Sequence, residues 1–251
     1  MEKLSSKTMD AKHYLIGVSL NRKEITDFHT YPYNIAAVKS LNKLYFNPNV
    51  TFIVGENGAG KSTLIEAIAI SCGFNSEGGS RNFNFSTKET HSELYKHISV
   101  QKGLKRPSDG FFLRAESFYN VASNIDNELA PYIEVYGGES LHKMSHGESF
   151  IALILNRFRG KGLYILNEPE AALSPTRQLT MLARIHDLVE MGSQFIISTH
   201  SPILMTYPDS TIFMINENGI NEVNYEETEH FIVTKQFLNN RQSMIRELFK
   251  D

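Results

Sequence analysis

The sequence predicts an α/β fold in which a mainly parallel sheet is flanked by helices. An apolar run over residues 50–54 is typical of a buried strand, and a glycine-rich turn over residues 55–62 follows it directly. Two further short apolar runs, residues 163–166 and 194–199, stand on either side of a helix over residues 175–191. Buried strands that alternate with helices indicate a parallel sheet with right-handed crossovers, whose ligand binds at the carboxyl edge of the strands.

The N-terminal part of the chain predicts strands on both sides of an aromatic loop. Residues 13–20 and 43–54 have the apolar content of strands, and the loop between them contains Phe28-His29-Thr30-Tyr31-Pro32-Tyr33. The apolar helix that begins after the glycine-rich turn ends near Gly73. The polar, glycine-containing stretch over residues 75–90 predicts an ordered loop.

The rest of the chain predicts further strands and helices. Residues 111–115 indicate a strand, and residues 118–129 start a short helical piece. Residues 147–158 are apolar nearly all round, which predicts a buried helix. Two more strands and a charged helical tail, whose charges favour a solvated face over a binding arm, follow over residues 212–215, 219–225 and 226–251.

The helix over residues 175–191 has the clearest end signals in the chain. Ser174 is suited to be its N-cap, Pro175 its first residue and Gly192 its stop. One apolar stripe along it predicts the face that packs on the sheet, formed by Leu182, Ile185, Leu188 and Val189.

The composition limits the class of protein. A length of 251 residues with 41% hydrophobic and 21% charged residues suits one α/β domain, and the net charge of -3 gives no overall attraction to nucleic acid or anionic membrane. The single cysteine, Cys72, excludes an internal disulfide and predicts a small core residue in a reducing compartment. Residues 1–7 lack an apolar signal segment and no apolar stretch approaches about 18 residues, so we expect a cytoplasmic protein without a membrane span.

The glycine-rich turn fits the pattern G-x-x-x-x-G-K-[ST] between a strand and a helix. Backbone N–H groups of such a loop, together with the positive end of the following helix, cradle a β-phosphate. Lys61 would reach the β- and γ-phosphates, and the Ser62 hydroxyl would contact Mg²⁺. The sequence therefore predicts binding of a nucleoside triphosphate, ATP with Mg²⁺, by Gly55, Glu56, Asn57, Gly58, Ala59, Gly60, Lys61, Ser62 and Thr63.

Further motifs follow this loop in the order found in ATP-binding-cassette (ABC) ATPases. Residues 141–148 resemble the family's signature sequence, with Ser145, Gly147 and Glu148 in the S-G-G-Q register and His146 in place of a glycine. Three later segments resemble the Walker B strand with its catalytic glutamate, the D-loop and the switch histidine, over residues 163–170, 171–175 and 198–202. With residues 112–118, the full run is similar to a family of small stand-alone predicted ATPases of bacteria.

The resemblance implies a single ABC-type P-loop NTPase domain over residues 1–251, with an antiparallel N-terminal β part and a short helical subdomain at about 117–147. It implies that Lys61, Glu168 and His200 are catalytic: Glu168 polarises the attacking water, and His200 donates to the γ-phosphate. It also implies a homodimer in which Ser145, Gly147 and Glu148 bind the γ-phosphate held by the other subunit, with Ser174 at the dimer seam.

Two positions depart from the family pattern. Asn167 stands where the family has an aspartate that supports Mg²⁺, and an asparagine keeps one acceptor oxygen but loses the charge. Either Mg²⁺ binding weakens and leaves a nucleotide switch, or Ser62, Glu168 and the phosphates hold the metal and hydrolysis is slow. The Q-loop residue, a further metal contact, is Glu116 by position, with Gln101 as the alternative. The predicted metal ligands are Ser62, Asn167 and Glu116.

About eighty residues separate Lys61 from Ser145, too few for the coiled-coil arms of chromosome-maintenance ATPases. The leading hypothesis is an ATPase that dimerises with ATP and acts on an unidentified protein partner, in genome defence or DNA maintenance. The alternatives are an ATP-binding subunit of a transporter and a non-hydrolysing switch. Direct DNA binding is not indicated by the charge, although a local patch is open to Arg81, Lys102, Lys105 and Arg106. For adenine stacking, the candidates are Phe28, Tyr31 and Tyr33, with ordinary packing as the alternative.

Overall fold

The computed structural model describes residues 12–81, 91–128 and 130–250. Several sequence predictions reach beyond these ranges. The signal-free N-terminus, the second part of the predicted loop and the last residues of the 118–129 and 226–251 elements lie outside the described residues, at positions 1–7, 82–90, 129 and 251.

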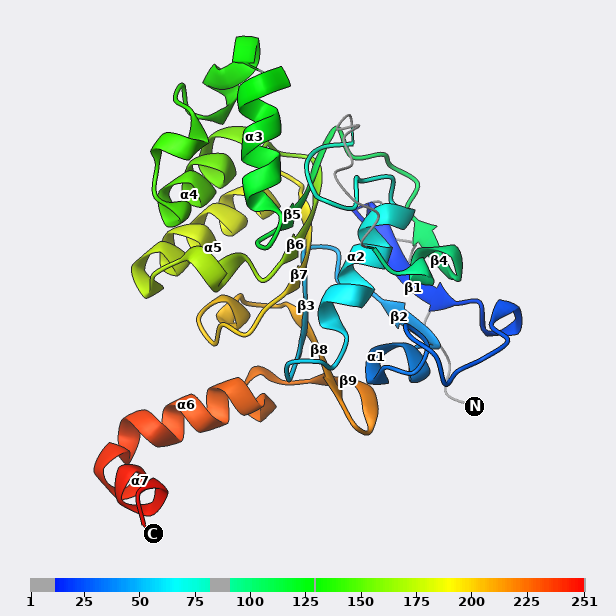
Figure 1. Cartoon of the computed structure of the whole chain (residues 1–251), viewed down its shortest axis with the longest axis vertical. Coiled ribbons are helices and arrows are strands. Elements are labelled where there is room, and N and C mark those ends of the chain that lie inside the picture. Colours follow the sequence, from blue (N-terminus) through cyan, green and yellow to red (C-terminus); the bar gives the residue numbers. More distant parts are fainter. Residues whose placement is uncertain (1–11, 82–90, 129, 251) are drawn as a thin grey trace.

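A six-stranded sheet forms the centre of the molecule (Figure 1). Neighbouring strands pair in parallel from β5 to β8, and the last strand, β9, pairs antiparallel with β8. This confirms the predicted mainly parallel sheet. In spatial order the strands are β5 (Asp109–Arg114), β6 (Gly162–Asn167), β7 (Gln194–Ser198), β3 (Val50–Gly55), β8 (Thr211–Asn216) and β9 (Gly219–Val223).

A smaller antiparallel sheet confirms the predicted N-terminal β part. Its order is β2 (Lys43–Tyr45), β1 (Leu15–Leu20) and β4 (Ile98–Lys102). The predicted 43–54 strand region is two strands, β2 and β3, which belong to different sheets. Strand β4 was not predicted, because Ile98 is its one buried residue and its pairing with β1 is a contact distant in sequence.

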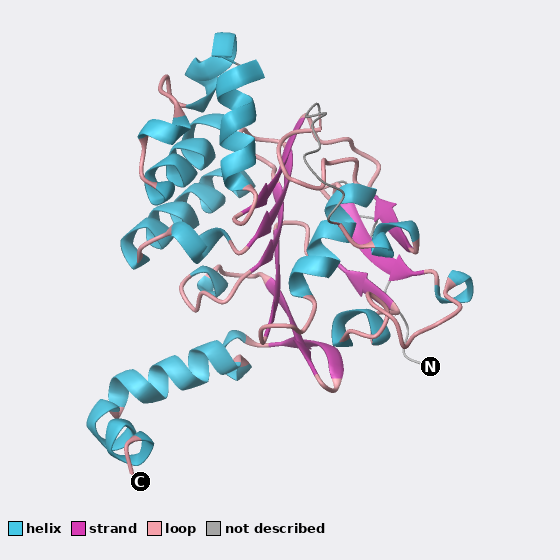
Figure 2. Cartoon of the chain, in the orientation of Figure 1, coloured by secondary structure: helices cyan, strands magenta, loops and turns pink. Residues whose placement is uncertain are grey.

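Helices cover both faces of the large sheet (Figure 2). On one face lie α1 (Ala36–Lys39), α2 (Lys61–Ser71) and the small sheet; on the other lie α3 (Phe118–Glu128), α4 (His146–Arg157) and α5 (Pro175–Glu190). Successive strand side chains point to opposite faces, so Phe52 packs in the α3–α5 core and Ile53 in the α2 core. Burial on both faces explains why the central strands are continuous apolar runs.

The helix predicted over residues 147–158 is present as α4, but it is buried on one face only. Helix α4 buries Phe150, Leu153 and Ile154, but Leu155 is 42% exposed. The helix packs on α5 with one face only, so the other face meets solvent despite its apolar residues. The end signals of α5 are confirmed: Ser174 is its N-cap and the helix closes just before Gly192.

The chain continues after β9 into α6 (Glu229–Asn239) and α7 (Arg241–Leu248), which extend away from the sheet (Figure 1). Neither helix contains a fully buried residue. The side chain of Thr228, which caps α6, is by contrast completely buried. Among the described residues, a helix of the length and apolar character needed to cross a membrane is absent.

Candidate active site

The glycine-rich loop, Asn167, Glu168 and His200 lie together at the carboxyl edge of the large sheet, as the sequence predicts. Parallel pairing places Asn167 at the end of β6 opposite Arg114 of β5 and Ser198 of β7. The glycine-rich loop leaves the end of β3, which pairs with β7 on one side and β8 on the other. Loops that leave neighbouring parallel strands at the same edge bring distant parts of the sequence into one site.

The loop from Gly55 to Ser62 leaves the first turn of α2 free to bind an anion. Gly60 is the N-cap, with a left-handed backbone (φ 96°) and no side chain to bond the first N–H groups of the helix. A Cβ atom on Gly60 would lie 2.6 Å from Cδ1 of Ile35, so a larger residue does not fit. Unbonded N–H groups at a positive helix end suit a phosphate, so the loop fits a nucleoside triphosphate.

Lys61 is held inside this loop. Its side chain is buried, and Nζ donates to the carbonyl oxygens of Gly55 and Glu56 at 2.9 Å each. Burial lowers the pKa of Lys61, and the carboxylates of Glu168 and Glu170 oppose this shift. The ammonium group is therefore held by two carbonyl oxygens beside the end of β6. Phosphate oxygens could replace these carbonyl oxygens as its hydrogen-bond acceptors.

Asn167 and Glu168 stand at the end of β6 in contrasting conformations. Asn167 is buried, and its Oδ1 accepts a hydrogen bond from the Ser198 hydroxyl at 2.6 Å. Glu168 has a left-handed backbone (φ 52°, ψ 52°), which is uncommon for a residue with a side chain. Its N–H donates to the Ser198 carbonyl at 3.0 Å, which holds the strained residue at the sheet edge. The Glu168 side chain is 35% exposed and therefore open to water.

His200 faces Glu168 from the end of β7. Its Nε2 lies 3.8 Å from Oε1 of Glu168, and its backbone N–H donates to Oε1 of Glu170 at 2.6 Å. The buried Nε2 atom has no hydrogen-bond partner among the described residues. Burial, followed by the charges of Lys61 and His230, lowers the pKa of His200 to about 4, so the ring is neutral at neutral pH.

We expect the low pKa of His200 to make stability depend on pH. An unfolded histidine titrates near 6.5 and the folded one near 4, so the unfolded chain binds more protons between these values. The free energy of unfolding should therefore fall as the pH decreases through this window. Urea unfolding at about pH 7 and about pH 5 measures the fall, which His200→Phe should reduce. An unchanged slope in that variant would contradict the assignment.

Three oxygen-bearing residues were predicted as metal ligands. Ser62 lies in the first turn of α2, and Asn167 keeps a second lone pair on its amide oxygen beside Glu168. Hydroxyl, amide and carboxylate oxygens are the donors that Mg²⁺ prefers, so this set fits the ion. Glu116 fits a metal site less well than Ser62 and Asn167, because its side chain is 72% exposed and forms an ion pair with Arg114 at 2.8 Å.

Ser145, Gly147 and Glu148 lie at the start of α4, on the face of the sheet opposite α2 (Figure 1). The Ser145 N–H and hydroxyl both donate to Oε2 of Glu148, at 3.0 and 2.7 Å, and Glu148 pairs with Arg177 at 3.2 Å. The structure thus forms the predicted helix start but does not bring these residues to Lys61 of the same chain.

The three candidates for adenine stacking have different surroundings in the aromatic loop. Tyr33 donates or accepts a hydrogen bond with Nδ1 of His97 at 2.8 Å, and Phe28 packs between Tyr33 and Arg22. Tyr31 is 62% exposed, with its hydroxyl 3.4 Å from Oγ1 of Thr63 in α2. Tyr31 is therefore the candidate with a free ring face beside the loop.

Sequence reasoning missed two residues of this site. Glu170 was treated only as part of a motif, yet it accepts the His200 N–H, and burial raises its pKa. His230 was placed on a solvated tail, yet its Nε2 lies 2.9 Å from Nδ1 of His200. The spacing in sequence contains no signal for either contact, because both depend on how distant segments pack.

Comparison with known proteins shows the family to which the chain belongs. Residues 25–250 match the AAA domain family. Over 171 residues, 61% of this chain, it is 26% identical to ABC transporter G family member STR2 of Medicago truncatula, and it spans 24% of that protein's length. Over 187 residues, 66% of this chain, it is 28% identical to the thiamine import ATP-binding protein ThiQ of Haemophilus influenzae, covering 82% of that protein.

Among solved structures, the chain is similar to cbiO1 from Clostridium perfringens, part of the ABC transporter complex cbiONQ. The two share 18% sequence identity, with a TM-score of 0.48 over 94% of this chain and 99% of that one.

Proposed function

The chain belongs to the AAA domain family and is an ABC-type P-loop ATPase by fold, and from this premise we propose that it binds and hydrolyses ATP with Mg²⁺ as a dimer that acts on a protein partner. The observation that carries this proposal is the convergence of Lys61, Glu168 and His200 at one sheet edge, with the glycine-rich loop beside them.

Each of these residues has a chemical task in the proposed reaction. Lys61 and the first N–H groups of α2 bind the phosphates. Lys61 supplies a positive charge, and the N–H groups donate hydrogen bonds. Glu168 orients and polarises the attacking water, and neutral His200 offers a donor to the γ-phosphate. Mg²⁺, with Ser62 and Asn167 as ligands, would neutralise charge on the phosphates.

The proposed dimer follows from the position of the signature residues. Ser145 and Glu148 start α4 on the far side of the sheet from α2, so they can serve a nucleotide only if a second copy presents its own loop to them. A two-fold axis then creates two equivalent sites, each with the loop of one copy and the signature of the other.

Mixing two inactive variants tests this arrangement. Lys61→Ala removes the phosphate-binding ammonium and keeps the signature, whereas Ser145→Arg blocks the signature and keeps the loop. Each variant alone should lack turnover, and an equal mixture should recover about a quarter of wild-type activity, because half of the dimers are mixed and each has one intact site. No recovery, although both variants fold and bind each other, would contradict the head-to-tail dimer.

Co-purification distinguishes two kinds of partner. Similarity to ThiQ favours a transporter subunit as the alternative, and co-purification with a membrane permease from native cells would support it. Recovery of a non-membrane protein, dependent on ATP and lost in Lys61→Ala, would support the proposed soluble partner.

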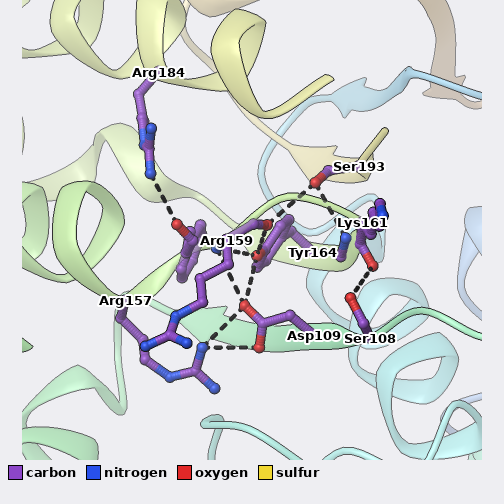
Figure 3. Close-up of polar contacts among 10 residues, drawn as sticks. Ser108, Asp109, Arg157, Arg159, Lys161, Tyr164, Arg184 and Ser193 are labelled. Atoms are coloured by element: carbon purple, nitrogen blue, oxygen red, sulfur yellow. Dashed lines mark hydrogen bonds and ion pairs between the residues drawn. The ribbon is translucent and has the colours of Figure 1, made fainter. Parts of the chain in front are cut away.

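A second candidate function, nucleic-acid binding, is favoured by a wide cleft of about 1050 Å³ at the opposite edge of the sheet. Its lining includes the residues just before three strands, Ser108, Lys161 and Ser193 (Figure 3). Lys12, Lys105 and Arg106 also line it, with Glu190 as the carboxylate.

The cleft has four cationic side chains, Lys12, Lys105, Arg106 and Lys161. None of the four forms an ion pair with any other described residue, whereas the nearby Arg157 is tied to Asp109 at 2.8 Å (Figure 3). Of the patch suggested by sequence, Lys105 and Arg106 lie in the cleft, but Arg81 stacks on Phe74 and Lys102 belongs to β4. The cleft therefore supports a phosphate-backbone contact that the net charge of -3 does not suggest.

We expect the triple variant Lys105→Gln, Arg106→Gln, Lys161→Gln to weaken binding to a DNA duplex about tenfold or more and to flatten its salt dependence by about one unit of slope per lost phosphate contact. Fluorescence anisotropy at several salt concentrations measures both. The matched control removes the same charge from the α6–α7 segment, with Lys235→Gln, Arg241→Gln and Arg246→Gln. Equal effects of the two variants, or no binding by the wild type, would contradict this candidate.

A further inference from the structure

The C-terminal helix α6 contacts His200 of the candidate active site through His230. His230 is the second residue of α6, and its Nε2 lies 2.9 Å from Nδ1 of His200, with the ring centroids 5.1 Å apart. Thr228 fixes the start of the helix: its side chain is completely buried, and its hydroxyl accepts from the Phe231 N–H at 3.3 Å. His230 is thus held in place at the root of a helix that otherwise extends away from the protein.

A hydrogen bond between two neutral histidines can run in either direction. If His200 donates from Nδ1, its Nε2 is left as a bare acceptor; if His230 donates, His200 keeps its hydrogen on Nε2. The carboxylate of Glu168 stands 3.8 Å from Nε2 of His200. A lone pair facing a carboxylate is repelled, while an N–H is attracted, so the geometry selects the second arrangement.

We propose that His230 is a positioning residue that fixes His200 in the tautomer with the hydrogen on Nε2, and that it thereby couples α6 to the reaction site. This inference rests on the proposed function, in which the Nε2 hydrogen is the donor offered to the γ-phosphate. The His200 Nε2 atom is buried and has no partner among the described residues, which leaves it available for that task.

The charged groups around the pair support two neutral rings. Burial lowers the pKa of His200 and that of His230, and the charge of Lys61 acts in the same direction on both. Glu229, next to His230, opposes the shift there. Glu170 receives the His200 backbone N–H and so fixes the main chain while leaving the ring free to respond to His230.

Helix α6 has room to move relative to the loop. A cavity of about 450 Å³ separates its first turn from the glycine-rich loop, lined by Asn57, Ala59, Ile215, His230 and Ile232 among others. A tilt of α6 would lengthen the single 2.9 Å bond and release the His200 ring to change its tautomer. The position of α6 and the state of the reaction site are therefore linked through His230.

The test compares two substitutions in the full-length chain. His230→Phe keeps a ring but removes the donor, and His230→Gln keeps a side-chain N–H. Nitrogen-15 NMR of labelled histidines should show the Nε2–H tautomer of His200 in the wild type and in His230→Gln, and a mixture of tautomers in His230→Phe. With ATP and Mg²⁺, kcat of His230→Phe should fall about 10- to 100-fold with KM unchanged, as for other partners that orient a reacting histidine.

Two controls separate this role from a general loss of structure. His186→Phe removes another hydrogen-bonded histidine, whose Nδ1 lies 3.4 Å from the Tyr207 hydroxyl, and should leave both readouts unchanged. In a His200→Ala background, His230→Phe should cause no further loss of kcat, because its effect runs through His200.

The outcomes distinguish this inference from the proposed function. An unchanged His200 tautomer in His230→Phe, or a further loss of kcat in the His200→Ala background, overturns the role of His230. A wild-type chain without turnover overturns the proposed hydrolysis, while a tautomer change in His230→Phe would still support the coupling of α6 to His200.

Discussion

We expect the Glu168→Gln chain to bind ATP and to hydrolyse it about 10²- to 10⁴-fold more slowly than the wild type, because the carboxylate that polarises the attacking water is lost. Glutamine has nearly the same shape, so the left-handed backbone and its bond to the Ser198 carbonyl should remain. The loop and Lys61 are untouched, which separates binding from chemistry.

Steady-state turnover and equilibrium ATP binding measure these two effects, and mass analysis measures the oligomer. If ATP stabilises the closed dimer and hydrolysis releases it, Glu168→Gln should accumulate ATP-bound dimers. Glu222→Gln, an equivalent change on the exposed strand β9, is the matched control and should behave as wild type. Retained turnover in Glu168→Gln would show that another group activates the water.

Asn167→Asp should raise the Mg²⁺ affinity and increase turnover at least about tenfold, the factor that corresponds to 1.4 kcal/mol. The amide oxygen of Asn167 already accepts from the Ser198 hydroxyl at 2.6 Å, so aspartate can keep this bond and add a charge for the metal. With Mg²⁺ removed by a chelator, we expect Asn167→Asp to destabilise the protein instead. A buried carboxylate beside Glu168 then lacks its cation and should cost about 1–3 kcal/mol of unfolding free energy.

Thermal unfolding with and without Mg²⁺, together with turnover, gives the measurement. Ser198→Ala is the control that removes the Ser198–Asn167 hydrogen bond without adding charge. Turnover restored only in Asn167→Asp would identify the wild-type chain as a nucleotide-holding switch. Unchanged metal affinity and turnover would contradict the placement of Asn167 beside the ion.

Local sequence predicted the parts of the site that are continuous in the chain. The run from Val50 to Ser71 contains a strand, a glycine-rich loop and a helix in direct succession, and the structure has them at β3 and α2. Helix α5 begins after Ser174 and closes before Gly192 for the same reason. Caps, glycine conformations and apolar runs act within a few residues, so their effects can be predicted without knowing the fold.

Long-range packing determined what this reasoning missed. Strand β4 exists because it pairs with β1, and α4 is half exposed because one face alone meets α5. His230 lies thirty positions after His200, and the bond between their rings depends on where β9 leads the chain.

By itself, the sequence determined the α/β class and the strand, glycine-rich loop and helix around Lys61, and it predicted that Glu168 and His200 belong to the same site, because these depend on neighbouring residues and on a fixed order of motifs. The tertiary structure alone decided that the signature residues lie across the sheet from the loop, that four cations share one cleft and that α6 contacts His200. These arrangements join residues far apart in the chain, and their geometry is set by strand order and core packing, which no local pattern encodes.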